Sequence, residues 1–236
     1  MIHVLYSRKL FLSNSAEFER NFAFFSFFAM IMMLLYMKIL WTTIKKQYET
    51  FEKDRSFVIH ASQEIRRASK LLIHAIVHKK KIIPDEEIKS IQKKIMALHK
   101  TVSNNPHLYH VGGLGEGIAE FVELVCLEAY KKGEKSLLSY IPHGLYHEAI
   151  LSGIADATGE LVRLARHSMD ADEVKKAHEW TSVVYAHFIE LPFSRNNVVR
   201  SKMEEVQRNM IRLEEILFAL QLKKEGATGS HVSTGG

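Results

Sequence analysis

Residues that interrupt helices or cross-link a chain are scarce in this sequence. Its 236 residues include only 1 cysteine, 4 prolines and 12 glycines. The single cysteine, Cys126, excludes an internal disulfide framework and is typical of a reducing compartment, so we expect a cytoplasmic location. With few prolines and glycines to break the chain, long helices are predicted.

Strand patterns are also absent. No segment alternates convincingly between apolar and polar residues, whereas the stretch from Trp41 to His78 repeats apolar residues at spacings near three, four and seven. Pro84 marks the start of a second helix that ends near Lys100, and a loop rich in Asn, His and Gly is predicted over residues 101–117. Further helices are predicted over residues 118–133, around 156–160, to about 190 after an N-cap at Asp170 or Asp172, and over 197–224.

These patterns predict an all-α protein with one helical domain over residues 41–226, and the two ends of the chain differ from it. Residues 22–37 carry no charge, and extension to Trp41 gives twenty residues that include only Lys38 as a charge. About twenty apolar residues are needed to cross a bilayer. Residues 227–236 are small and polar and are expected to form a disordered tail.

Two interpretations of the hydrophobic N-terminal segment, residues 1–40, stay open. It is either a membrane anchor or a stretch upstream of the true start, which would be one of four methionines: Met30, Met32, Met33 or Met37. No small-residue cleavage site follows it, which disfavours a cleaved secretory signal. A membrane is therefore a partner only if residues 22–41 are translated and inserted.

The overall charge is basic. There are 32 Lys and Arg residues against 27 Asp and Glu residues, with 13 His, and the sequence pI is about 9.1. This balance is compatible with a polyanionic partner such as nucleic acid. Each basic cluster by itself is typical of a solvated helix face.

Two pairs of carboxylates lie within apolar helical segments. Glu120 and Glu123 are three residues apart, and Asp156 and Glu160 are four apart, so each pair projects from one face of its helix. Burying an unpaired carboxylate costs roughly several kcal/mol, so such acids usually meet a metal ion, a basic partner or a functional cavity. If the two pairs face each other, they would hold Mg²⁺ or Mn²⁺.

A plainer interpretation of these acids is that they are surface residues of amphipathic helices, paired with Lys131 or Arg163. Glu116 leaves both interpretations open, because it extends the first pair into a stripe at i, i+4 and i+7 that could equally be a solvated edge. Other chemistries have less support. No serine stands in a GxSxG motif and Cys126 has no obvious triad, so the sequence does not support a nucleophilic hydrolase.

Four segments of the sequence resemble the translin family. They are QEIRRASKLLIHAIV, HLYHVGGLGEGIAEFVELV, AILSGIADATGELVRLA and MEEVQRNMIRLEEILFALQLKKEG. Within that family the chain is similar to the Trax type, translin-associated factor X, in its archaeal single-gene form. The resemblance covers roughly Trp41 to Gly226. It leaves out the hydrophobic N-terminus, which favours a start downstream of that segment.

The resemblance implies an all-α bundle of about seven helices and closed homo-oligomers, typically octamers, that enclose a cavity for nucleic acid. Trax-type subunits are Mg²⁺-dependent endoribonucleases whose catalytic acids lie in an ExxE segment and a DxxxE segment. On this sequence, both the catalytic and the metal-binding residues would be Glu120, Glu123, Asp156 and Glu160. RNA is the implied substrate, and all four positions are acidic here, which translin itself would not show.

One departure from the family concerns DNA. Translin has an Arg/His cluster just before the helix of the first acid pair, and only His107 and His110 remain near that place here. Strong sequence-preferring DNA binding is therefore not expected. The alternative function is a non-catalytic oligomer of translin type that binds single-stranded DNA or RNA, in which the acids are structural.

Overall fold

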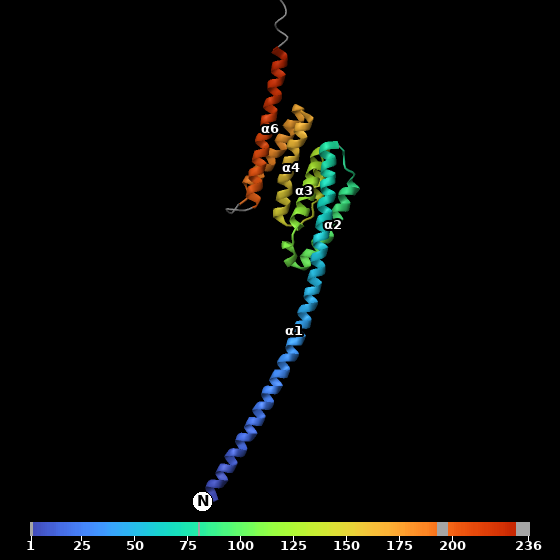
Figure 1. Ribbon diagram of the computed structural model, residues 1–236. Helices are drawn as coiled ribbons and strands as arrows, with labels where there is room; N and C mark the ends of the chain where they lie inside the picture. Colours follow the sequence, from blue (N-terminus) through green and yellow to red (C-terminus); the bar gives the residue numbers. More distant parts are fainter. Residues whose placement is uncertain (1, 80, 193–197, 230–236) are drawn as a thin grey trace, which may run out of the picture. The chain divides into compact units, whose positions relative to one another are not determined.

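The computed structural model describes residues 2–79, 81–192 and 198–229, and the side chains of residues 26–79, 81–192 and 198–224. Within those ranges the chain forms α-helices and short 3₁₀ helices and no strand, which confirms the predicted all-α class (Figure 1). The elements are α1 Ile2–Lys79, α2 Asp85–Asn104, η1 Pro106–His110, α3 Leu114–Lys132, η2 Lys135–Tyr140, α4 His147–Ser168, α5 Ala171–Ile189 and α6 Val198–Gly229.

The chain divides into two compact units, Met1–Lys53 and Asp54–Gly236. The described part of the first unit is the N-terminal portion of α1, whose apolar side chains, such as Phe27 and Trp41, are exposed. By length and composition alone, one described helical stretch, Ser26–Lys79, is long and apolar enough to cross a membrane, with a mean hydropathy of 1.8 in its most apolar part.

The expected disordered tail falls mainly outside the described residues. α6 continues to Gly229, and residues 230–236 are not described.

α3 is the most buried helix of the second unit. Apolar residues occur on nearly all of its faces, and Phe121, Leu124 and Leu127 are completely buried. A helix that is hydrophobic all round belongs in a protein interior. α4 packs against α3, α5 and α6, and α5 also packs against α6. Residues on the facing sides of α3 and α4 therefore meet inside the helical unit (Figure 1).

The predicted loop over residues 101–117 is wrong in its extent. α2 continues to Asn104, η1 follows, and α3 already begins at Leu114. Gly117 thus lies inside α3, where a Cβ atom would stand 2.9 Å from the backbone oxygen of Ser62 on α1. This glycine permits a close approach of two helices, whereas the Asn, His and Gly content of the segment predicted a loop.

Two helix ends follow the predicted signals. Gly133 ends α3 with a φ of 69°, a left-handed conformation that glycine adopts without strain. Asp170 is the N-cap of α5, and its carboxylate accepts hydrogen bonds from the backbone N–H groups of Asp172 and Glu173. Of the two predicted capping residues, Asp170 is therefore the one used.

Candidate functional site

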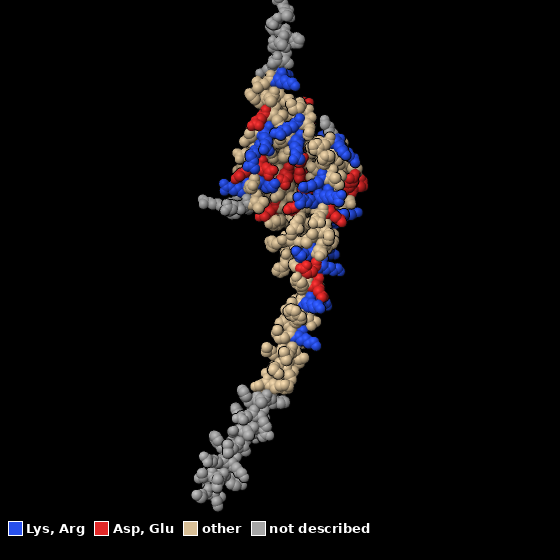
Figure 2. Space-filling view, viewed as in Figure 1, with Lys and Arg blue, Asp and Glu red and all other residues tan. Residues whose placement is uncertain are grey.

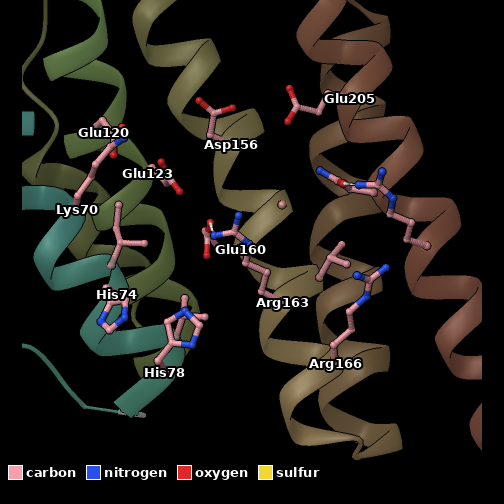
Figure 3. Close-up of a pocket in the computed structure, with 16 residues that line it drawn as sticks. Lys70, His74, His78, Glu120, Glu123, Asp156, Glu160, Arg163, Arg166 and Glu205 are labelled. Carbon is pink, nitrogen blue, oxygen red and sulfur yellow. Dashed lines mark hydrogen bonds and ion pairs between the residues drawn. The ribbon is translucent and has the colours of Figure 1, made fainter.

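The two predicted pairs of acids meet across the contact between α3 and α4. At Gly153 of α4, a Cβ atom would lie 2.3 Å from the carbonyl oxygen of Ala119 on α3, so only glycine permits this approach. The acids follow these two positions along their helices and line one cavity of about 570 Å³, to which α1 and α6 also contribute (Figure 3). This cavity, called the acidic cavity below, is lined by the four predicted acids, Glu120, Glu123, Asp156 and Glu160, and also by Glu205 of α6.

Three of the four acids have a basic partner. The pairs are Lys70 with Glu120 at 3.0 Å, Arg163 with Glu160 at 2.7 Å, and Lys202 with Asp156. The partners come from α1, α4 and α6, so three helices supply positive charge to these acids.

Glu123 is the exception. Its side chain has no hydrogen-bond or ion-pair partner within the part of the chain that the structure describes, and the residue is only 8% exposed. Burial, and then the negative charges of Glu120, Glu160 and Asp156, raise the pKa of Glu123 to about 8. At neutral pH without a cation, Glu123 therefore holds a proton.

In Asp156 and Glu160, unlike Glu123, burial and a basic partner change the pKa in opposite directions. Burial raises the pKa of Asp156, although the hydrogen bond from Lys202 opposes the change. Burial also raises the pKa of Glu160, against the effect of Arg163. Burial works to lower the pKa of Lys202, but hydrogen bonds to Asp156 and Glu205 outweigh it and the pKa rises. The basic partners thus balance the negative charge of the cavity only in part.

Arginines border the acids. Arg163, Arg166 and Arg212 all line the acidic cavity, and Arg166 has no hydrogen-bond or ion-pair partner among the described residues. Figure 2 shows the acidic side chains gathered at the centre of one face of the helical unit, with Lys and Arg around them. A guanidinium group matches the geometry of a phosphate, so this border suits a polyanion.

The acids that were predicted to hold a divalent cation are not arranged as a closed metal site. Among the described residues, no three His, Cys, Asp or Glu side chains stand close enough together to hold a metal ion. Basic side chains supply the compensating charge instead. The donor set nevertheless fits Mg²⁺ or Mn²⁺, because these ions prefer carboxylate oxygens and Glu123 has no cation of its own.

The plainer interpretation of the acids applies to Glu116 and not to its neighbours. The Glu116 side chain is 61% exposed and pairs with Arg66. The side chains of Glu120 and Glu160 are 16% and 12% exposed, although Glu160 does pair with Arg163 as that interpretation expected.

Burial alone does not mark a functional acid in this protein. Glu128, on α3, is completely buried, and its carboxylate accepts a hydrogen bond of 3.0 Å from the backbone N–H of Ile83. Lys132 Nζ lies 3.2 Å from the same carboxylate. Glu128 therefore ties α3 to the segment before α2, and it has a structural partner where Glu123 has none.

Several residues of the acidic cavity were not singled out from the sequence. Glu205 lies on α6 next to Lys202, which pairs with it from outside the cavity lining, and Lys70 belongs to a basic cluster of α1 that is typical of a solvated face. The only sequence signal for α6 was that its segment is among the four that resemble the translin family. Charge spacing within one helix could not show that these residues reach acids on other helices.

The fold and the cavity define an α-helical protein that concentrates carboxylates, bordered by arginines, between its helices. A sequence model described as the Translin family matches residues 44–224, and the chain belongs to that family. This confirms the family resemblance, and the Trax subtype stays a prediction. No curated protein matches the sequence.

Solved structures show the same fold. The chain is 22% identical to AfC3PO in a structure of its complex with duplex RNA, with a TM-score of 0.64 and coverage of 76% of this chain and 95% of that chain. It is 21% identical to apo-NeC3PO, with a TM-score of 0.63 and coverage of 75% and 95%. At these identities the comparison establishes the fold of the helical unit.

Proposed function

We propose that this protein is a metal-dependent endoribonuclease of Trax type that works in the cytoplasm and cleaves RNA within a homo-oligomeric shell, expected to be an octamer. The observation that carries the proposal is the convergence of the four predicted carboxylates on one cavity bordered by arginines. Family membership and the duplex RNA bound to AfC3PO support an RNA ligand and an oligomer.

The residues that would hold Mg²⁺ or Mn²⁺ are Glu120, Glu123, Asp156 and Glu160. When bound, the cation would neutralise charge that develops on the phosphoryl oxygens and make a water molecule more acidic. A cation would also lower the pKa of Glu123, because it favours the charged form of a neighbouring carboxylate.

The remaining steps belong to side chains of this chain. Hydrolysis requires a water oxygen to attack phosphorus while the bond to the leaving sugar oxygen breaks. Glu123 or Glu160 would orient this water and accept its proton. Arg166 and Arg212 would bind the phosphates of the RNA strand next to the acids and hold the reacting bond in place.

The test is cleavage of an end-labelled single-stranded RNA by wild-type protein and by Glu123→Ala and Glu123→Gln, each with Mg²⁺ and with EDTA. We expect cleavage that requires Mg²⁺ and falls at least about a hundredfold in both variants, while RNA affinity stays nearly unchanged. Glu179→Gln is the matched control, because Glu179 is an exposed acid on α5 outside the acidic cavity. Equal loss of binding and cleavage in the Glu123 variants would contradict the catalytic assignment.

A second function is favoured by the pairing of three acids with basic side chains. In that case the protein would be a non-catalytic oligomer of translin type that binds single-stranded DNA or RNA, and the acids would be structural. Affinity should then fall steeply with salt, because phosphate contacts supply most of it. RNA that stays intact after long incubation with Mg²⁺, bound equally by wild type and Glu123→Ala, would favour this function.

A further inference from the structure

A second hollow adjoins the acidic cavity. It has a volume of about 320 Å³ and is lined by residues of α1, α3, α4 and α6 and by Tyr146, the residue just before α4. Glu120 and Asp156 line both hollows. These two acids therefore stand at the boundary between the hollows.

The two hollows follow one another along the same four helices. On α1, Arg66 lines the second hollow, and residues from Lys70 onward line the acidic cavity. On α4, Ser152 lines the second hollow, and Arg166 lies at the far end of the acidic cavity. Figure 3 shows Glu120 and Asp156 at the end of the acidic cavity opposite Arg166. An RNA strand bound across the acids of the acidic cavity would thus continue into the second hollow beyond Glu120 and Asp156.

The lining of the second hollow differs in kind from that of the acidic cavity. Its walls include Ala119, Ala149 and Val198, and the residue Tyr146 is 41% exposed. Its polar and charged side chains form ion pairs and hydrogen bonds with one another. Arg66 forms an ion pair with Glu116, Lys202 forms one with Asp156, and the Tyr146 hydroxyl donates a hydrogen bond to Glu148.

This lining favours a flat, uncharged group over a phosphate. The cations that face the hollow already contact carboxylates, so a phosphate would have to displace an internal partner. Apolar walls beside one accessible aromatic ring suit a ring that stacks, and nucleobases stack on aromatic side chains regardless of their identity. The volume lies at the lower end of the range for ligand pockets.

We infer that the second hollow is a nucleobase subsite, where Tyr146 stacks on the base of a nucleotide next to the scissile phosphate. The inference rests on the proposed function, because the acidic cavity must hold that phosphate. It adds that one neighbouring base is bound through its flat face, so recognition there depends on the presence of a base and little on which base it is.

The test combines changes in the protein with changes in the RNA. A labelled single-stranded RNA of ten nucleotides is prepared in ten versions, each with an abasic ribonucleotide at one position, and cleavage is measured bond by bond. We expect kcat/KM at a given bond to fall about tenfold when the abasic position lies directly on one side of that bond. In Tyr146→Ala, kcat/KM for the intact RNA should fall by a similar factor. The further fall in kcat/KM that the abasic position causes, called the abasic penalty below, should disappear.

Tyr146→Phe is the matched control. It keeps the ring and removes only the hydroxyl that donates to Glu148, so the abasic penalty should remain. A purely structural role of Tyr146 would slow all RNAs equally and leave the penalty in place, and that result would overturn the subsite while the nuclease stands.

Failure of the proposed function has a different signature. If no RNA is cleaved, the same ten RNAs are compared by binding affinity in wild type, Tyr146→Ala and Tyr146→Phe. An abasic penalty that only Tyr146→Ala removes would then support the subsite without the nuclease. Penalties that are equal in all three proteins would overturn the subsite as well.

Discussion

Gly153 of α4 lies against the backbone of Ala119 on α3 so closely that a Cβ atom at position 153 would stand 2.3 Å from the Ala119 carbonyl oxygen and 2.7 Å from Val122 Cβ. A Cβ atom does not make contacts that short, so the two helices would have to separate to admit any side chain. Glu120 directly follows Ala119, and Asp156 lies about one turn after Gly153, so the separation of the two acid pairs depends on this contact.

Gly153→Ala is expected to destabilise the protein by about 3 kcal/mol, which at this chain length lowers Tm by roughly 6 to 12 °C. Gly159→Ala is the matched control on the same helix, because its Cβ would meet nothing closer than Asn209 Nδ2 at 3.6 Å. Alanine is the better helix former, so the control should keep or raise Tm. Thermal unfolding followed by circular dichroism measures both, and equal Tm values for the two variants would refute the contact.

Glu123→Gln should change how stability depends on pH in protein stripped of metal with EDTA. The pKa of Glu123 is raised to about 8 from the ordinary glutamate value of 4.5, so the folded state binds more protons than the unfolded state between these values. Its contribution to stability is therefore present below about pH 4.5 and is lost as pH rises through about 8. Glutamine stays neutral, so the Tm of the variant relative to wild type should rise by about 3 °C or more between pH 5 and pH 9.

The control for this experiment is Glu179→Gln, whose Tm difference from wild type should stay constant over the same range. A difference between Glu123→Gln and wild type that does not change with pH would show that Glu123 is ionised throughout.

Lys70→Met should strengthen Mg²⁺ binding. The Lys70 ammonium lies 3.0 Å from Glu120 and occupies a place where a cation would otherwise be attracted. Removing this competing charge should lower the half-saturating Mg²⁺ concentration by about threefold or more, read from the rise of Tm with added Mg²⁺. Lys175→Met is the control, since Lys175 pairs with Glu179 on an exposed face of α5. Weaker Mg²⁺ binding in Lys70→Met would mean that Lys70 positions Glu120 for the ion.

The chain that carries residues 22–41 should associate with lipid vesicles. The stretch contains one charged residue, Lys38, and its described apolar side chains are exposed, so a bilayer would remove them from water. We expect the full chain to float with neutral phosphatidylcholine vesicles in a density gradient and a chain begun at Met37 to stay at the bottom. Identical behaviour of the two proteins would argue against an anchor.

Local signals in the sequence predicted much of the helical architecture. The break at Pro84, the glycine at the end of α3 and the cap at Asp170 are decided by backbone chemistry within a few residues, so sequence patterns identify them. The same holds for the spacing that puts each acid pair on one face of a helix. The extent of the loop over residues 101–117 was mispredicted because Gly117 packs closely against Ser62, which is far away in the chain and which a local pattern does not reveal.

The sequence by itself determined that the protein is all-α, that it belongs with the translin family, and that two acid pairs lie within apolar helices. Only the tertiary structure decided that these pairs share a cavity, because the contact at Gly153 joins separate helices. Tertiary structure also decided which acids are paired with a positively charged side chain. Lys202 reaches Asp156 across 46 residues of sequence, whereas Glu123 meets no cation among the described residues. Periodicity reports one helix at a time, and charge balance in a cavity is a property of several helices packed together.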